Sequence, residues 1–261
     1  LAAAELLVGD GNPSGKTVDT FAKSLDDYPS TYNFHESRDY VDYTDDIYVG
    51  YRYFETIPGA AEKVVYPFGY GLSYTTFDVE TVSAGVVNSN CTSEANKLYA
   101  KVRVTNTGKF SGKEVVQVYI AKPQGKLGKP AKELAAFEKT RELQPGESQL
   151  MILTWEINDM ASYDDLGKVK KSAYVLEAGS YDIYVGTSVR DVTKADYSYI
   201  LNHDVITEQL SAKLVPTSLP KRMLADGSYE ALPQSEPVDT DYSAIGNIDP
   251  SLTEGVAPGQ R

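Results

Sequence analysis

The side chains best suited to chemistry lie in an aromatic and acidic stretch near the N-terminus. Residues 22–48 are rich in Asp, Tyr, Ser and Asn and keep no helical or strand period. We therefore predict a long ordered loop, and loops of this length often carry function. Because aromatic rings stack on the apolar C–H faces of sugars, Tyr40, Tyr43 and Tyr48 are candidates for a sugar-stacking surface. The alternative is that these rings only pin the loop to its domain.

Two further positions join these candidates. Arg52 lies between Tyr51 and Tyr53, where its guanidinium would stack on a ring or pair with a carboxylate. Tyr70 lies between two glycines, which would leave one edge of its ring free to reach a sugar. The predicted substrate rim consists of Tyr43, Tyr48, Arg52 and Tyr70.

The remaining reactive side chains form no recognisable catalytic or metal-binding set. The chain has 37 Asp and Glu residues, so two neighbouring carboxylates alone would not indicate acid–base chemistry. Its single cysteine, Cys91, excludes an intrachain disulfide framework, and the two histidines, His35 and His203, do not complete a zinc site of the usual composition. We assign no catalytic residue, no metal ligand and no cofactor.

The stretch 66–77 (YPFGYGLSYTTF) organises the elements that must position these residues. Its proline and two glycines punctuate an aromatic run, which predicts a tightly turned, partly buried crossing. The sequence before it is irregular, and the sequence after it alternates regularly. We therefore place a domain seam here and predict that four rings act as an interdomain staple: Phe68, Tyr70, Tyr74 and Phe77.

Beyond this stretch the hydrophobic period becomes two, as in β-strands. The alternating segments are 97–105, 115–121, 149–157 and 181–185, and Asn-Thr-Gly and Pro-Gly turn sequences separate them. The pattern predicts a two-sheet sandwich of about seven strands from residue 76 to about 205. The side chains predicted to be buried are Val102, Val104, Val116, Val118, Ile152, Trp155, Ile183 and Val185.

The composition excludes several classes of function. A net charge of −12 argues against nucleic acid or an anionic membrane surface as a partner. No segment approaches about 18 consecutive apolar residues. The N-terminus also lacks the basic-then-apolar pattern of a signal peptide. We expect a soluble protein, cytoplasmic rather than secreted, and a neutral ligand such as a sugar is compatible with this charge.

Several stretches of the sequence resemble glycoside hydrolase family 3. Residues 49–54 (VGYRYF) and 66–77 resemble the sequence at which the α/β-sandwich domain of that family passes into a fibronectin-III-like domain. Residues 6–16 (LLVGDGNPSGK) are similar to the end of the α/β-sandwich domain. The fibronectin-III-like domain is matched in order by 102–108, 114–119, 130–137, 143–147 and 178–186.

The resemblance implies a mainly β fold, an immunoglobulin/fibronectin-III-like β-sandwich preceded by a partial α/β-sandwich segment. The domains would be 1–75, the end of the α/β sandwich with its Tyr- and Asp-rich loop; 76–212, the fibronectin-III-like sandwich; and 213–261, an extended tail or interdomain linker. The helix formers at residues 2–8 have no capping residue before them, so we expect a helix entered midway and a chain that is part of a larger enzyme.

The same resemblance implies a retaining β-glucosidase type of hydrolase acting on a β-glucoside or oligosaccharide. Its two carboxylates would flank the anomeric carbon. In the family these belong to a (β/α)8 barrel and to an earlier part of the α/β sandwich, and neither motif is present here. The expected partners are therefore these catalytic domains, and a barrel following residue 261 is one arrangement. A homo-oligomer stays open.

The main alternative comes from a different class of protein. It is a stand-alone fibronectin-III-like module for carbohydrate binding or adhesion, without catalytic activity. An independent module would be expected to start with its own helix cap, which is the sequence feature that separates the two interpretations.

Overall fold

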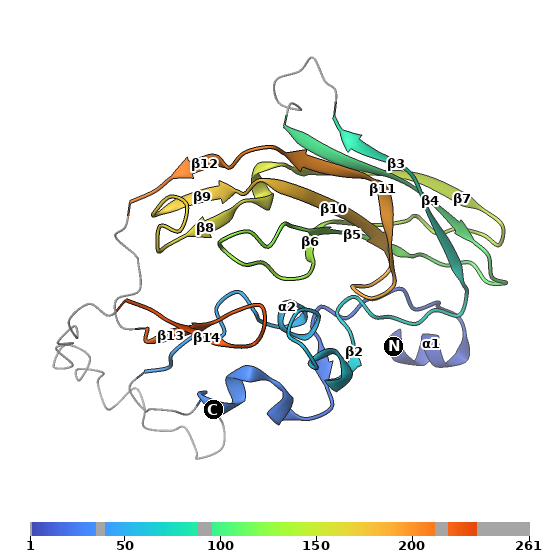
Figure 1. Cartoon of the computed structure of the whole chain (residues 1–261). Coiled ribbons are helices and arrows are strands. Elements are labelled where there is room, and N and C mark those ends of the chain that lie inside the picture. The colour runs from blue at the N-terminus through green and yellow to red at the C-terminus, as the bar shows by residue number, and fades with distance from the viewer. Residues whose placement is uncertain (1, 35–39, 88–95, 212–218, 234–261) are drawn as a thin grey trace, which may run out of the picture.

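The computed structural model describes residues 2–34, 40–87, 96–211 and 219–233, so His35 and Cys91 lie outside the described residues. A β-sandwich forms the larger part of the molecule, an N-terminal segment lies beneath one of its faces, and a C-terminal hairpin lies beside that segment (Figure 1). The prediction of a mainly β fold is confirmed.

The N-terminal segment contains short elements joined by long connections. They are α1 (Ala2–Val8), β1 (Phe21–Ala22), η1 (Leu25–Asp27), η2 (Pro29–Tyr32), α2 (Tyr51–Phe54), η3 (Ala61–Lys63) and β2 (Val64–Tyr66). The described residues of the loop predicted at 22–48 thus contain two 3₁₀ turns. The first is held by a capping box between Ser24 and Asp27, which satisfies backbone N–H groups at the start of the turn.

The sandwich has two principal sheets of antiparallel strands. One is ordered β11-β10-β5-β6 and the other β3-β4-β7, while β12-β9-β8 form a smaller sheet at one end. The strands are β3 (Phe77–Val86), β4 (Lys97–Asn106), β5 (Val115–Ala121), β6 (Glu133–Lys139), β7 (Ser148–Glu156), β8 (Ser162–Asp164), β9 (Ala173–Leu176), β10 (Gly179–Gly186), β11 (Val192–Leu201) and β12 (Val205–Gln209), with the 3₁₀ turn η4 (Asn158–Met160) after β7.

The core follows the period-two pattern, because alternate side chains of each strand face the opposite sheet. The predicted core residues Val102, Val104, Val116, Val118, Trp155, Ile183 and Val185 are all buried, as predicted. Ile152 is the exception and is 60% exposed. It lies an odd number of positions from Trp155 and so points to the outer face of β7, where Lys101 is its cross-strand neighbour.

Strand β5 differs from its neighbours because five consecutive residues, 116–120, are buried. One face contributes Val116, Val118 and Ile120 to the core. The other face presents Gln117 and Tyr119, which are covered by the N-terminal segment: the Tyr119 ring lies 6.1 Å from that of Tyr51. The N-terminal segment is therefore packed on the outer face of the β11-β10-β5-β6 sheet.

The C-terminal region contains an element that the sequence pattern did not predict. Lys221–Met223 (β13) and Tyr229–Ala231 (β14) pair as an antiparallel hairpin within the region expected to be extended. Among the described residues, no helix has the length and apolar character needed to cross a membrane.

Candidate functional site

The backbone of the seam stretch 66–77 binds both parts of the molecule. On the side of the N-terminal segment, the Thr17 N–H donates to the Tyr70 carbonyl at 2.7 Å, and the Gly69 N–H donates to the Thr17 carbonyl at 2.8 Å. On the sandwich side, the Val189 N–H donates to the Phe68 carbonyl at 3.1 Å. The stretch therefore lies between the two parts and bonds to each.

The four rings predicted as a staple lie at the seam with different exposure. Phe68 is half-buried, with its ring centroid 4.6 Å from that of Tyr51, and Phe77 is half-buried against the sandwich core. Tyr70 is half-buried, with its ring 5.1 Å from that of Tyr66. Tyr74 is 50% exposed, and its hydroxyl donates to the Leu6 carbonyl at 2.8 Å.

Asn12 connects three segments and was not singled out from the sequence. Its Oδ1 accepts from the Ser73 hydroxyl and from the Tyr74 N–H, both at 2.9 Å. Its Nδ2 donates to the Ser111 carbonyl at 2.8 Å. Four residues further on, Lys16 pairs with Glu114 at 2.8 Å. Asn12 and Lys16 belong to the Asn-Pro-Ser-Gly-Lys stretch that carried the family resemblance. The contacts of these two residues show that this motif joins the N-terminal segment to the seam and to the sandwich.

A second set of contacts anchors the segment around α2. The Tyr51 hydroxyl accepts from the Leu134 N–H at 2.9 Å, and the Thr56 hydroxyl accepts from the Ala131 N–H at 2.8 Å. Arg190 pairs with Glu55 at 2.8 Å and donates to the Ala61 carbonyl at 2.9 Å. The helix carrying the predicted rim residue Arg52 is therefore fixed to the edge strand β6 and to the β10–β11 turn.

The predicted rim residues do not form one surface. Tyr43 is 82% exposed, whereas Tyr48 is only 2% exposed. Burial, with a smaller effect from the Asp46 carboxylate, raises the pKa of Tyr48 to about 12. This corrects the prediction that the Tyr48 ring faces a sugar, because the ring is buried within this chain.

Arg52 and Tyr70 have their own local partners. Arg52 pairs with Glu133 at 3.4 Å, which is the carboxylate pairing anticipated for it. It also lines a cavity of about 240 Å³ between α2 and the open edge of the sandwich, together with Lys122, Trp155 and Asp159. Tyr70 faces Tyr66 in the seam instead. Among the described residues, no cluster of three or more His, Cys, Asp or Glu has metal-binding geometry.

A large hollow lies beside α1. A cavity of about 800 Å³ is lined by α1, by the Gly9–Asn12 turn, and by Tyr74, Phe110 and Glu142. The outer side of the helix is apolar and uncovered, since Leu7 is 86% and Val8 71% exposed.

The fold and the seam define a class of protein, and the sequence comparisons agree with it. Residues 1–74 match the glycosyl hydrolase family 3 C-terminal domain, and residues 114–189 match the fibronectin type III-like domain. The chain belongs to glycoside hydrolase family 3 and corresponds to a segment of such an enzyme. These matches favour that interpretation over a stand-alone module.

Individual relatives are β-glucosidases. The chain is 63% identical over 253 residues to β-glucosidase A of Butyrivibrio fibrisolvens, covering 94% of this chain and 30% of that protein. It is 44% identical to a β-glucosidase of Ruminococcus albus, covering 94% of this chain and 25% of that protein. The solved structure of a β-glucosidase from Paenibacillus barengoltzii matches with a TM-score of 0.78 at 46% identity, over 90% of this chain and 26% of that chain. The chain thus spans less than a third of these relatives.

Proposed function

We propose that this chain is the supporting part of a retaining β-glucosidase and does not itself supply the catalytic carboxylates. The observation that carries the proposal is the uncovered apolar side of α1, at Leu7 and Val8, beside the cavity at the seam. A folded chain stabilises such a surface by burying it against other protein. The remainder of the α/β-sandwich domain is the surface that would cover it.

Retaining hydrolysis requires two carboxylates about 5 Å apart, one as nucleophile and one as acid and base. We place both in the other domains, a (β/α)8 barrel and the rest of the α/β sandwich. The substrate would be a β-glucoside or a short oligosaccharide, consistent with the names of the relatives. Tyr43, which is 82% exposed, is the predicted rim residue that we expect to contact such a sugar.

The proposal is tested by separating the chain from the rest of its enzyme. The complete gene product should hydrolyse a nitrophenyl β-glucoside, a version lacking this chain should lose that activity, and the purified chain added back should restore it. Leu7→Glu in the added chain should weaken the restoration, because a charge would then lie in the contact. Leu150→Glu is the matched control, since Leu150 is also exposed but lies on the outer face of β7.

Two results would contradict the proposal. One is a complete gene product without β-glucosidase activity. The other is equal activity with and without this chain, which would mean that the seam and its apolar surface do not support the catalytic domains.

A further inference from the structure

The C-terminal hairpin contacts the loop that carries Tyr43. Met223 of β13 is buried, and its N–H donates to the Thr44 carbonyl at 2.8 Å. The hairpin lies beside the N-terminal segment and below the β8–β9 end of the sandwich (Figure 1). It therefore contacts residues 43–48, which we call the Tyr43 loop, directly through the backbone of Met223.

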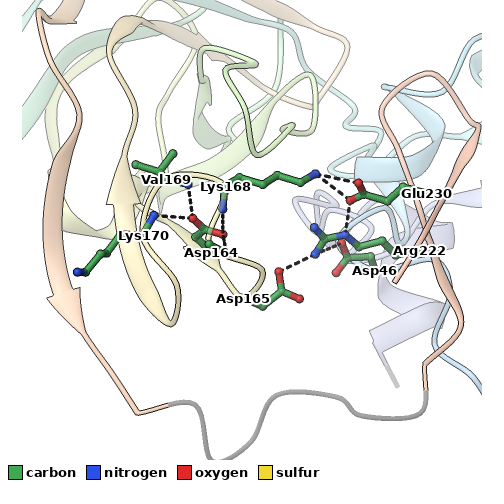
Figure 2. Close-up of polar contacts among 9 residues, drawn as sticks. Asp46, Asp164, Asp165, Lys168, Val169, Lys170, Arg222 and Glu230 are labelled. Atoms are coloured by element: carbon green, nitrogen blue, oxygen red, sulfur yellow. Dashed lines mark hydrogen bonds and ion pairs between the residues drawn. The ribbon is translucent and has the colours of Figure 1, made fainter. Parts of the chain in front are cut away.

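A charged cluster joins the hairpin to two other segments. The Arg222 guanidinium of β13 lies 2.7 Å from Glu230 of β14, 2.9 Å from Asp165 and 3.9 Å from Asp46 (Figure 2). Its side chain is only 13% exposed. A planar guanidinium with several donors suits a position among three carboxylates better than an ammonium does. Arg222 is therefore the common partner of the hairpin, the Tyr43 loop and the β8–β9 connection.

The backbone of the β8–β9 connection is held by several hydrogen bonds to one side chain. The Asp164 carboxylate accepts four backbone N–H bonds, from Gly167 at 2.7 Å, Lys168 at 3.0 Å, Val169 at 2.6 Å and Lys170 at 2.8 Å (Figure 2). These bonds fix the backbone that presents Asp165 and Lys168. Lys168 in turn contacts both oxygens of Glu230, at 2.9 and 3.0 Å.

The Tyr43 loop has little regular structure of its own and contains features that its surroundings must stabilise. Thr44–Tyr48 contains no helix or strand, and Asp46 has a φ of 52°, in the left-handed region that residues other than glycine seldom adopt, although Asp tolerates it better than most. Asp45 is buried and its Oδ1 has no hydrogen-bond partner among the described residues. Unfavourable backbone and unpaired polar groups persist only where the surroundings hold them in place.

We propose that the hairpin β13–β14 is a clasp that holds the Tyr43 loop, residues 43–48, on the sandwich, with Arg222 as the positioning residue that orients Tyr43 toward the sugar. The clasp itself rests on the contacts above. Its role toward a sugar rests on the proposed β-glucosidase function. The backbone of residues 164–170 is held by the Asp164 carboxylate. The contacts of Arg222 with Asp165 and Asp46 then restrain the loop relative to these residues.

Hydrogen exchange of this chain tests the clasp without any enzymatic activity. Arg222→Gln should accelerate amide exchange at Thr44–Tyr48 by roughly tenfold, because local opening becomes easier when the cluster is lost. Arg222→Lys should recover part of the protection. Arg103→Gln is the control, since Arg103 pairs with Glu80 at 2.7 Å on the exposed face of another sheet and should leave the loop unchanged. Unchanged exchange in Arg222→Gln would overturn the clasp.

Kinetics of the complete enzyme test the positioning role. Arg222→Gln should raise KM for a disaccharide severalfold with a smaller change in kcat, and Tyr43→Ala should do the same. The double variant should be no worse than the worse single variant, because both changes remove the same contact. Faster amide exchange in Arg222→Gln together with an unaltered KM would overturn the role of Arg222 in sugar binding. A complete enzyme without activity would refute the proposed function, while the exchange experiment would still decide on the clasp.

Discussion

Gly69 lies directly against the side chain of Gln117. A Cβ atom at position 69 would fall 2.4 Å from the Gln117 Oε1, and Gly69 has a φ of 80°. Gln117 is itself held in place, because its Nε2 donates to the Thr187 carbonyl at 2.7 Å and its Oε1 accepts from the Tyr119 hydroxyl at 2.5 Å. The seam stretch and strand β5 therefore approach as closely as a residue without a side chain allows.

Gly69→Ala should destabilise the chain more than the backbone angle alone explains. A left-handed φ costs a residue with a Cβ about 1–2 kcal/mol. Gly146→Ala measures this cost by itself, because Gly146 has a φ of 79° and open space around it. Urea unfolding of the two variants should show a larger loss for Gly69→Ala. Equal losses would mean that the contact with Gln117 does not constrain the seam.

Phe68→Ala should reduce the free energy of unfolding by about 2 kcal/mol, roughly half of the 3–5 kcal/mol typical of a fully buried phenylalanine. The reason is that the Phe68 ring is only half-buried, although it packs on Tyr51 at 4.6 Å. Chemical denaturation gives the value directly. A loss below about 0.5 kcal/mol, as for ordinary surface substitutions, would show that this ring is not part of a staple.

Lys129→Met should be strongly destabilising. The Lys129 ammonium and the Glu177 carboxylate lie 2.5 Å apart with side chains 2% and 4% exposed. Removing one partner of a buried pair costs about 3–5 kcal/mol, because the other charge stays buried. Adding Glu177→Gln should recover part of this loss. Lys194→Met, which breaks an exposed pair with Asp182, should cost less than about 1 kcal/mol, and a similar effect of the two lysine variants would contradict the argument.

Asp164 should make stability depend on pH in the acid range. Burial alone would raise the pKa of this carboxyl, but its four backbone N–H donors together outweigh burial and hold the pKa below 3.8. Its contribution is therefore complete above pH 3.8 and is lost as the pH falls through the lower folded-state pKa.

Asp164→Asn is the variant that measures this contribution. It should cost at least about 2 kcal/mol at pH 7, since hydrogen bonds to a charged group each contribute about 1.5–3 kcal/mol and the new NH₂ group faces two N–H donors. The difference in the free energy of unfolding between wild type and Asp164→Asn should become smaller as the pH falls toward 2. Asp78→Asn, on the exposed side of β3, serves as the control. A gap that stays constant between pH 7 and pH 2 would contradict the assignment.

The sandwich could be predicted because its strands carry their own pattern. The predicted stretch 115–121 is β5 itself, and 97–105 is one residue short of β4. At β7 both faces are apolar, so the pattern did not decide which face is inside, and Ile152 was placed wrongly. The burial of Gln117 and Tyr119 could not be predicted either, because it depends on the N-terminal segment that covers them.

Neither the hairpin nor the burial of Tyr48 could be predicted from the local sequence. Strands β13 and β14 have three residues each, too few to show a period. Their stability comes from partners distant in sequence, such as Asp165 for Arg222 and Thr44 for Met223. Tyr48 is buried for the same reason, since packing around the loop decides which of its tyrosines faces solvent.

The central claim, that this chain supports a β-glucosidase without carrying its catalytic carboxylates, is tested most directly by assaying the purified chain alone. It should release no nitrophenol from a nitrophenyl β-glucoside above the buffer background, because a retaining mechanism cannot form or resolve its glycosyl intermediate without the nucleophile. Measurable turnover by the chain, abolished when one of its own carboxylates is replaced by the amide, would contradict the claim.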